Sequence, residues 1–81
     1  METVEGTVLH DVDSTLLAAV GYAPTSQRAY CKFHPSARQA AAIWRYEGVT
    51  PAEWATWSSS ASMGRYFLQN IKGSKTSQRI G

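Results

Sequence analysis

Two helix-start signals in the last third of the chain constrain the fold more than any other feature. The first combines Thr50, Pro51 and Glu53. Thr50 can cap a helix, Pro51 suits the first helical position because its missing N–H needs no partner there, and Glu53 can reach back to complete a capping box. Val49 and Trp54 then occupy the positions of a hydrophobic staple. These residues predict a helix that begins at Pro51.

This first helix is expected to cover a sheet with its aromatic face. Its side chains at positions i, i+3, i+4 and i+7 are Trp54, Trp57, Ser58 and Ala61. Ser62 then restarts the pattern as a second N-cap, and Gly73 can end a second helix. The buried stripe predicted for the second helix consists of Met63, Tyr66, Phe67, Asn70 and Ile71.

Three segments ahead of the helices have the character of strands. Residues 16–22 form an apolar run that ends in turn residues at 23–26. Residues 42–47 are predicted to be a strand that Gly48 ends, because their aromatic and β-branched side chains outweigh the helix-favouring alanines before them. The segment between them alternates with the period of a half-buried antiparallel strand. One of its faces carries Ala29, Cys31 and Phe33, and the other carries Arg28, Tyr30 and Lys32.

The order of these elements predicts an α+β domain in which a three-stranded antiparallel sheet is packed on one face by two C-terminal helices (β-β-β-α-α). A chain of 81 residues is the size of one domain. Residues 12–73 are expected to fold as that domain. Residues 1–11 are an acidic extension, either an edge strand or disordered, and residues 74–81 are a basic, flexible tail.

No apolar run approaches the ~20 residues that a membrane-spanning helix requires, so no membrane partner is expected. The N-terminus carries Glu2 and Glu5 where a secretory signal would have basic residues. The single cysteine, Cys31, excludes an intramolecular disulfide. Together these features predict a cytoplasmic protein.

Charge is distributed unevenly along the chain, although the formal net charge is only +2. Residues 1–13 contain acidic side chains and neither lysine nor arginine. Residues 54–81 contain no acidic side chain, and their cations are Arg65, Lys72, Lys75 and Arg79. Such a gradient is typical of a weak phosphate-binding surface, and it also arises by chance in small proteins.

Six short motifs occur along residues 12–73 in an order shared with a known domain family. They are Ser14 with residues 17–22, Cys31 with Phe33, Trp44-Arg45-Tyr46, Val49 with Pro51, residues 62–67 and residues 71–73. This order resembles the KTSC domain family, which is named after the C-terminal module of some lysyl-tRNA synthetases. The resemblance implies a small α+β domain, found alone in bacterial and phage proteins or appended to the synthetase, for which RNA binding has been proposed.

The chain departs from the family pattern at two places. The central Tyr-x-Tyr of the family is Trp44-Arg45-Tyr46 here, and a longer connection at residues 34–43 replaces the tight glycine turn before it. This insertion is where the protein is expected to differ from its relatives in the choice of partner.

The start of the second helix is the first candidate binding site. Ser62 caps the helix, Gly64 removes side-chain bulk and Arg65 adds a fixed charge, so backbone N–H groups and a guanidinium can converge on a phosphate or carboxylate. Arg65, Gln69 and Lys72 continue along the helix at i, i+4 and i+7, a spacing that can follow a phosphate backbone. The alternative is structural: a cap, a glycine that permits close packing, and a solvated polar face.

Two aromatic groups are candidates for stacking on a base. Tyr30 lies between Arg28 and Lys32 on the outward face of its strand, where the ring can stack while the cations hold phosphate, unless it is an ordinary exposed tyrosine. Trp44 and Tyr46 share a face that is either core beneath the helices or, if it is exposed, a stacking platform.

Support for catalysis is weak. Cys31 and His34 have metal-like spacing, but a closed zinc site requires four ligands, and only His10 and scattered carboxylates remain. The strand alternation turns the Cys31 thiol inward, which argues against a nucleophile. No metal or cofactor is therefore predicted, and the protein is not expected to be an enzyme.

The expected function is that of a binding module for RNA or another phosphate-bearing partner. Two hypotheses compete with it: a protein-interaction module, such as a phage-encoded inhibitor of a host protein, and a sponge for a small nucleotide. The sequence leaves the oligomeric state open.

Overall fold

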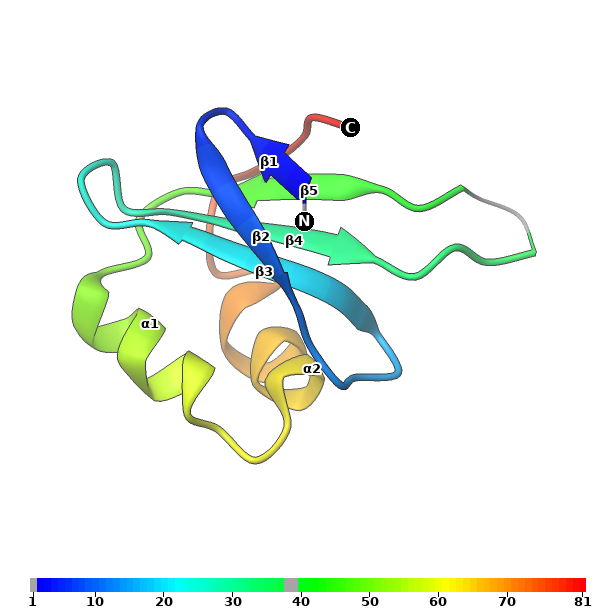
Figure 1. Ribbon diagram of the computed structural model, residues 1–81. Helices are drawn as coiled ribbons and strands as arrows, with labels where there is room; N and C mark the ends of the chain where they lie inside the picture. Colours follow the sequence, from blue (N-terminus) through cyan, green and yellow to red (C-terminus); the bar gives the residue numbers. More distant parts are fainter. Residues whose placement is uncertain (1, 38–39) are drawn as a thin grey trace.

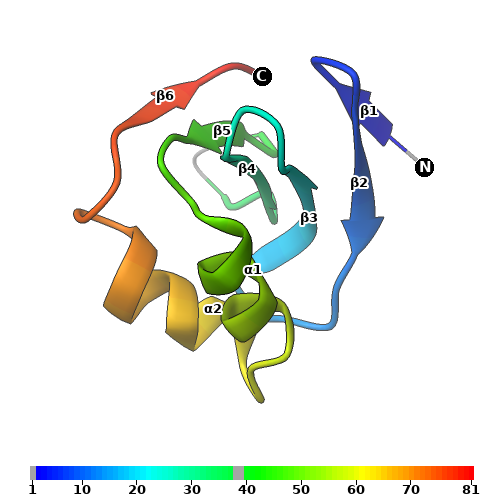
Figure 2. The same ribbon diagram turned by 90° about the vertical axis from the view of Figure 1, so that its left-hand side faces the viewer.

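The computed structural model describes residues 2–37 and 40–81, which form one antiparallel sheet and two short helices (Figure 1). The strands are hydrogen-bonded to one another in chain order: β1 (Glu2–Val4), β2 (Thr7–Asp11), β3 (Leu17–Ala23), β4 (Arg28–Phe33), β5 (Ile43–Tyr46) and β6 (Ser77–Arg79). The sheet curls strongly, and the helices lie against one side of it (Figure 2).

Both helices begin where the sequence predicts. The first, α1 (Pro51–Ser58), is capped by Thr50, whose Oγ1 accepts a hydrogen bond from the Glu53 N–H at 3.1 Å. The second, α2 (Met63–Tyr66), is capped by Ser62, whose Oγ accepts from the Arg65 N–H at 3.2 Å, and it continues as a π-helical segment, η1 (Phe67–Ile71). The Glu53 carboxylate, predicted to close a capping box, lies 2.6 Å from Lys75 Nζ instead.

The prediction of a three-stranded sheet is wrong, because the described residues form six strands. β3, β4 and β5 are the predicted strands. The additional strands β1 and β2 come from residues 1–11, joined by a turn in which Glu5 and Gly6 have positive φ angles of 49° and 81°. β6 comes from residues 74–81, predicted to be a flexible tail, and it pairs with β5. Residues 38 and 39 of the insertion lie outside the described residues.

Both faces of the sheet carry a hydrophobic core. The larger core lies between the sheet and the helices and consists of Leu17, Val20, Ala29, Cys31, Tyr46, Val49, Trp57, Phe67 and Ile71. The smaller core, on the opposite face, consists of Leu9, Ala19, Tyr30 and Ile43. β2 crosses β3 and β4 steeply, so the β1–β2 hairpin reaches over this second face (Figure 1). Each face of the central strands is therefore at least partly covered by other elements.

The prediction that Tyr30 faces solvent is wrong. Its side chain is only 2% exposed, and its hydroxyl donates a hydrogen bond to Glu5 Oε1 at 2.8 Å. The alternation itself is correct, since Arg28 and Lys32 share the face of Tyr30, but the β1–β2 hairpin covers that face. Lys32 Nζ accordingly lies 2.6 Å from Glu2 Oε1.

The hairpin also brings a carboxylate to the cations of β4 and β5. Arg45 contacts Glu5 at 2.9 Å and Glu47 at 2.6 Å, and Arg28 contacts Glu47 at 2.8 Å. The hydrogen bonds from Tyr30 and Arg45 lower the pKa of Glu5. Burial alone would raise the pKa of Glu47, but the hydrogen bonds from Arg28 and Arg45 outweigh it and lower that pKa. These cations are occupied by the chain's own acids.

This network predicts that part of the stability is lost in acid. Because the pKa of Glu5 is lower in the folded state than in the unfolded state, its contribution is fully present above about pH 4.5 and disappears as the pH falls through the folded pKa. Glu5→Gln should therefore lower the urea midpoint at pH 7, and the difference from wild type should be smaller at pH 3. An equal difference at both pH values would show that the carboxylate charge is irrelevant.

Candidate functional site

Two adjoining hollows lie along the exposed side of the last helical segments. The first, the Arg65 hollow, has a volume of about 440 Å³ and is lined by Arg65 together with Asp13. The second, the aromatic cavity, has a volume of about 480 Å³ and lies between β4, β5 and η1. Leu16 and Leu68 line both, so the two hollows meet at these side chains.

The aromatic cavity brings together residues that the sequence analysis assigned to separate candidate sites. Lys72 lines it with Trp44 and Tyr46, and the structure adds two further rings, Phe33 and Phe67. Phe33 and Phe67 were recognisable only as core residues, because their place beside Trp44 depends on how the last helix packs on the sheet. The strand and helix candidates thus meet in one cavity.

The aromatic side chains that line this cavity differ in their burial and in their ring contacts. Phe67 is 2% exposed and makes edge-to-face contacts with Tyr46 and Phe33, at ring-centroid distances of 5.2 and 5.4 Å. Tyr46 is 5% exposed and belongs to the core, which was one of its two predicted roles. Trp44 and Phe33 are only partly buried, so these two rings form the accessible part of the wall.

The π-helical segment determines which side chain lies between Arg65 and Lys72. The Lys72 N–H donates to the Phe67 carbonyl oxygen at 2.9 Å, an i to i+5 bond that widens the turn relative to an α-helix. The predicted series Arg65, Gln69, Lys72 assumes α-helical spacing. Leu68, which is 52% exposed, lies between the two cations instead, and Gln69 lines neither hollow.

Ser62 and Gly64 have structural tasks at the helix start. Ser62 lines the Arg65 hollow, but its hydroxyl already accepts the Arg65 N–H. Gly64 is buried against the segment before β3, and a Cβ there would lie 2.9 Å from Ser14 Oγ and 3.4 Å from Leu16 Cβ. Close packing therefore accounts for the glycine. The cation of this corner is Arg65, which is exposed.

Arg65 and Lys72 differ from the cations of β4 and β5 in having no carboxylate partner among the described residues, a property that Arg79 of β6 shares. Among the described residues, the ion pairs involve Arg28, Lys32, Arg45 and Lys75, and none involves Arg65 or Lys72. The basic residues predicted on β4 are thus neutralised by the chain itself, whereas those on the last helix are not. Unpaired positive charge therefore remains on the last helix, where Asp13 moderates it beside Arg65.

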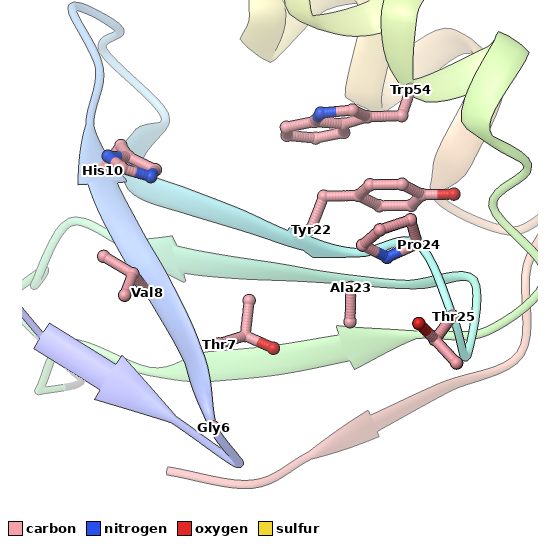
Figure 3. Close-up of a pocket in the computed structure, with 9 residues that line it drawn as sticks. All are labelled: Gly6, Thr7, Val8, His10, Tyr22, Ala23, Pro24, Thr25 and Trp54. Carbon is pink, nitrogen blue, oxygen red and sulfur yellow. The ribbon is translucent and has the colours of Figure 1, made fainter.

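A separate hollow of about 460 Å³ lies between β2, the end of β3 and α1 (Figure 3). Trp54 stacks over Tyr22 with ring centroids 5.1 Å apart and an interplanar angle of 9°, while His10 stands across the hollow on β2. The Tyr22 hydroxyl donates to the Val49 carbonyl oxygen at 2.6 Å. No lysine, arginine or carboxylate lines this hollow within the described part of the chain, so it offers an anion little attraction.

The residues considered for chemistry are held in structural contacts. Cys31 is fully buried, and burial raises the pKa of its thiol well above the ordinary value, which disfavours the nucleophilic thiolate. His34 Nε2 lies 2.8 Å from the Ser14 carbonyl oxygen. Within residues 2–37 and 40–81, no three histidine, cysteine or acidic side chains gather closely enough to hold a metal ion. In the same residues, no helix has the length and apolar character needed to span a membrane.

Comparison with known proteins identifies the fold and the family. A KTSC domain protein from Yersinia pestis has a crystal structure similar to this chain, with a TM-score of 0.79 and 25% sequence identity over 93% of this chain and 99% of that one. No match was found among curated proteins. The sequence matches the KTSC domain over residues 13–74, close to the limits of the predicted resemblance. The chain therefore belongs to the KTSC domain family.

Proposed function

We propose that this KTSC domain is a non-enzymatic module that binds single-stranded RNA on the side of the last helix that carries Arg65 and Lys72. One observation carries the proposal: Arg65 and Lys72 have no ion-pair partner among the described residues, and they line two hollows that meet at Leu68. The phosphate groups of a nucleic-acid backbone supply repeated negative charges, which two unpaired cations on one surface would attract.

The arrangement favours RNA over an isolated anion because it combines two cations with an aromatic surface. Arg65 lies at one hollow, and Lys72 and Trp44 lie at the other. Single-stranded nucleic acids are commonly held by cations that follow the backbone beside aromatic rings that stack on the bases. The buried Cys31 thiol supports the non-enzymatic part of the proposal. We place this function in the bacterial cytoplasm, or in that of the host if a phage encodes the protein.

Removing either cation should weaken RNA binding and also reduce the dependence of the affinity on salt concentration. With about two phosphate contacts, log–log plots of affinity against salt should have a slope near −1.4, which corresponds to about a sevenfold loss between 50 and 200 mM salt. Arg65→Ala or Lys72→Ala should each reduce the slope by about 0.7. Fluorescence anisotropy with a labelled uridylate hexamer measures both quantities.

Two variants serve as controls. Lys32→Ala removes the same charge from the opposite face of the sheet, where Lys32 is paired with Glu2 outside both hollows, and should leave the slope unchanged. Asp13→Asn removes an acid from the Arg65 hollow and should strengthen binding. Binding that is undetectable, or that ignores salt and both cations, would overturn the proposal. A pull-down that survives nuclease treatment would support the alternative of a protein partner.

A further inference from the structure

The aromatic cavity has the dimensions and lining of a ligand pocket rather than a gap in packing. Its volume of about 480 Å³ falls within the range of about 300–1,000 Å³ typical of small-ligand sites. Rings from β4, β5 and η1 form its walls, and Lys72 stands at its edge. Within the described residues no carboxylate lines it, so its charge suits an anionic ligand with an apolar body.

Trp44 is the ring of the cavity that has no ring partner among the described residues. Phe33 and Tyr46 both contact Phe67 edge-to-face, which fixes all three as the floor of the cavity. Among the described residues, Trp44 enters no such ring contact, although it lines the same space. An indole with an open face stacks well on a planar ring, and such stacking tolerates any base.

We infer that the aromatic cavity holds one unpaired base of the RNA, stacked on Trp44, with the adjacent phosphate beside Lys72. The inference rests on the proposed function and extends it, because cations alone would hold a ribose-phosphate backbone whether or not it carries bases. The exposed Leu68 lies between Lys72 and Arg65, where it provides an apolar surface between neighbouring phosphate contacts.

The inference is tested by comparing a uridylate hexamer with an abasic ribose-phosphate hexamer of the same length. Wild-type protein should bind the base-bearing hexamer about tenfold more tightly, since one stacked base contributes about five- to 150-fold in affinity. Trp44→Leu should lose this preference while keeping its affinity for the abasic hexamer. Trp44→Phe should keep part of the preference, because a smaller ring still stacks.

Trp54→Leu is the matched control, because it removes an indole from the separate hollow beside Tyr22 and should leave the preference unchanged. Thermal unfolding confirms that each variant is folded, and the Trp44→Phe result stands if Trp44→Leu does not fold. Equal affinity of wild type for both hexamers would overturn the base-binding inference and leave the RNA proposal intact. Binding to neither hexamer would overturn both. A preference that persists in both Trp44 variants would show that the base lies elsewhere.

Discussion

Trp57→Ala is expected to lower the free energy of unfolding by about 3–5 kcal/mol, the usual cost of truncating a fully buried tryptophan. The Trp57 side chain is 0% exposed. It packs edge-to-face on Trp54 and lies in stacked orientation against Tyr66 and Phe67. Alanine would leave a cavity between the sheet and both helices. Urea unfolding followed by circular dichroism measures the loss, which in a domain of this size approaches the total stability.

Trp57→Phe separates packing from hydrogen bonding. The indole Nε1–H donates to the Met63 carbonyl oxygen at 3.1 Å, so this side chain also connects α1 to the first turn of α2. Phenylalanine retains much of the ring volume but loses that bond, and the loss should be roughly half that of alanine. A destabilisation below about 1 kcal/mol for Trp57→Ala would contradict the packing described here. Because Met63 precedes the segment with Arg65 and Lys72, partial unfolding at this joint should also weaken RNA binding.

Gly21→Ala should destabilise the fold by about 2–3 kcal/mol through overpacking, although it adds a single carbon. A Cβ at Gly21 would lie 2.7 Å from the Val8 carbonyl oxygen and 2.9 Å from Leu9 Cδ2, where β2 crosses β3. A backbone oxygen cannot rotate away, so β2 itself would have to move. The displacement would loosen the hairpin that carries Glu5 to Arg45. Urea unfolding measures this loss as well.

Gly64→Ala provides the matched comparison. Its Cβ would lie 2.9 Å from Ser14 Oγ, which accepts the Leu16 and Leu17 N–H groups, so moving this hydroxyl weakens two hydrogen bonds. Because a side chain can adjust more easily than a backbone oxygen, and alanine is favoured over glycine in a helix by about 1 kcal/mol, we expect Gly64→Ala to destabilise the fold by about 1 kcal/mol, less than Gly21→Ala. Equal destabilisation by both substitutions would mean that the crossing of β2 over β3 is not the tight point that its geometry indicates.

The central strands and the helix starts are confirmed because their signals are local. A cap such as Thr50 or Ser62 bonds an N–H three residues ahead, so the pattern is readable wherever it occurs. Alternation within β4 likewise places Ala29, Cys31 and Phe33 on the helix side without reference to the rest of the chain. The short strands β1 and β6 lack such patterns. Tertiary pairing creates them, with Glu5-Gly6 as the one local hint of a turn.

The candidate site was predictable only in its parts. The absence of acids after Glu53 makes the last third of the chain basic, but it does not separate Arg65 and Lys72 from Lys75, which pairs with Glu53. The structure shows that Arg65 and Lys72 lack an ion-pair partner among the described residues. Leu68 could not be selected over Gln69, since periodicity assumes α-helical spacing and η1 is a π-helical segment. That RNA is the ligand stays a prediction.

The amino-acid sequence by itself determined where the helices begin, which strand residues share a face and which family the chain resembles, because each depends on residues a few positions apart. Only the tertiary structure decided which faces and charges remain free. Glu5 forms an ion pair with Arg45, 40 residues away in the sequence, and also accepts the hydrogen bond of the buried Tyr30 hydroxyl. By contrast, no acidic side chain among the described residues forms an ion pair with Lys72. Which cations are neutralised depends on how the curled sheet brings distant segments together, and periodicity carries no information about that.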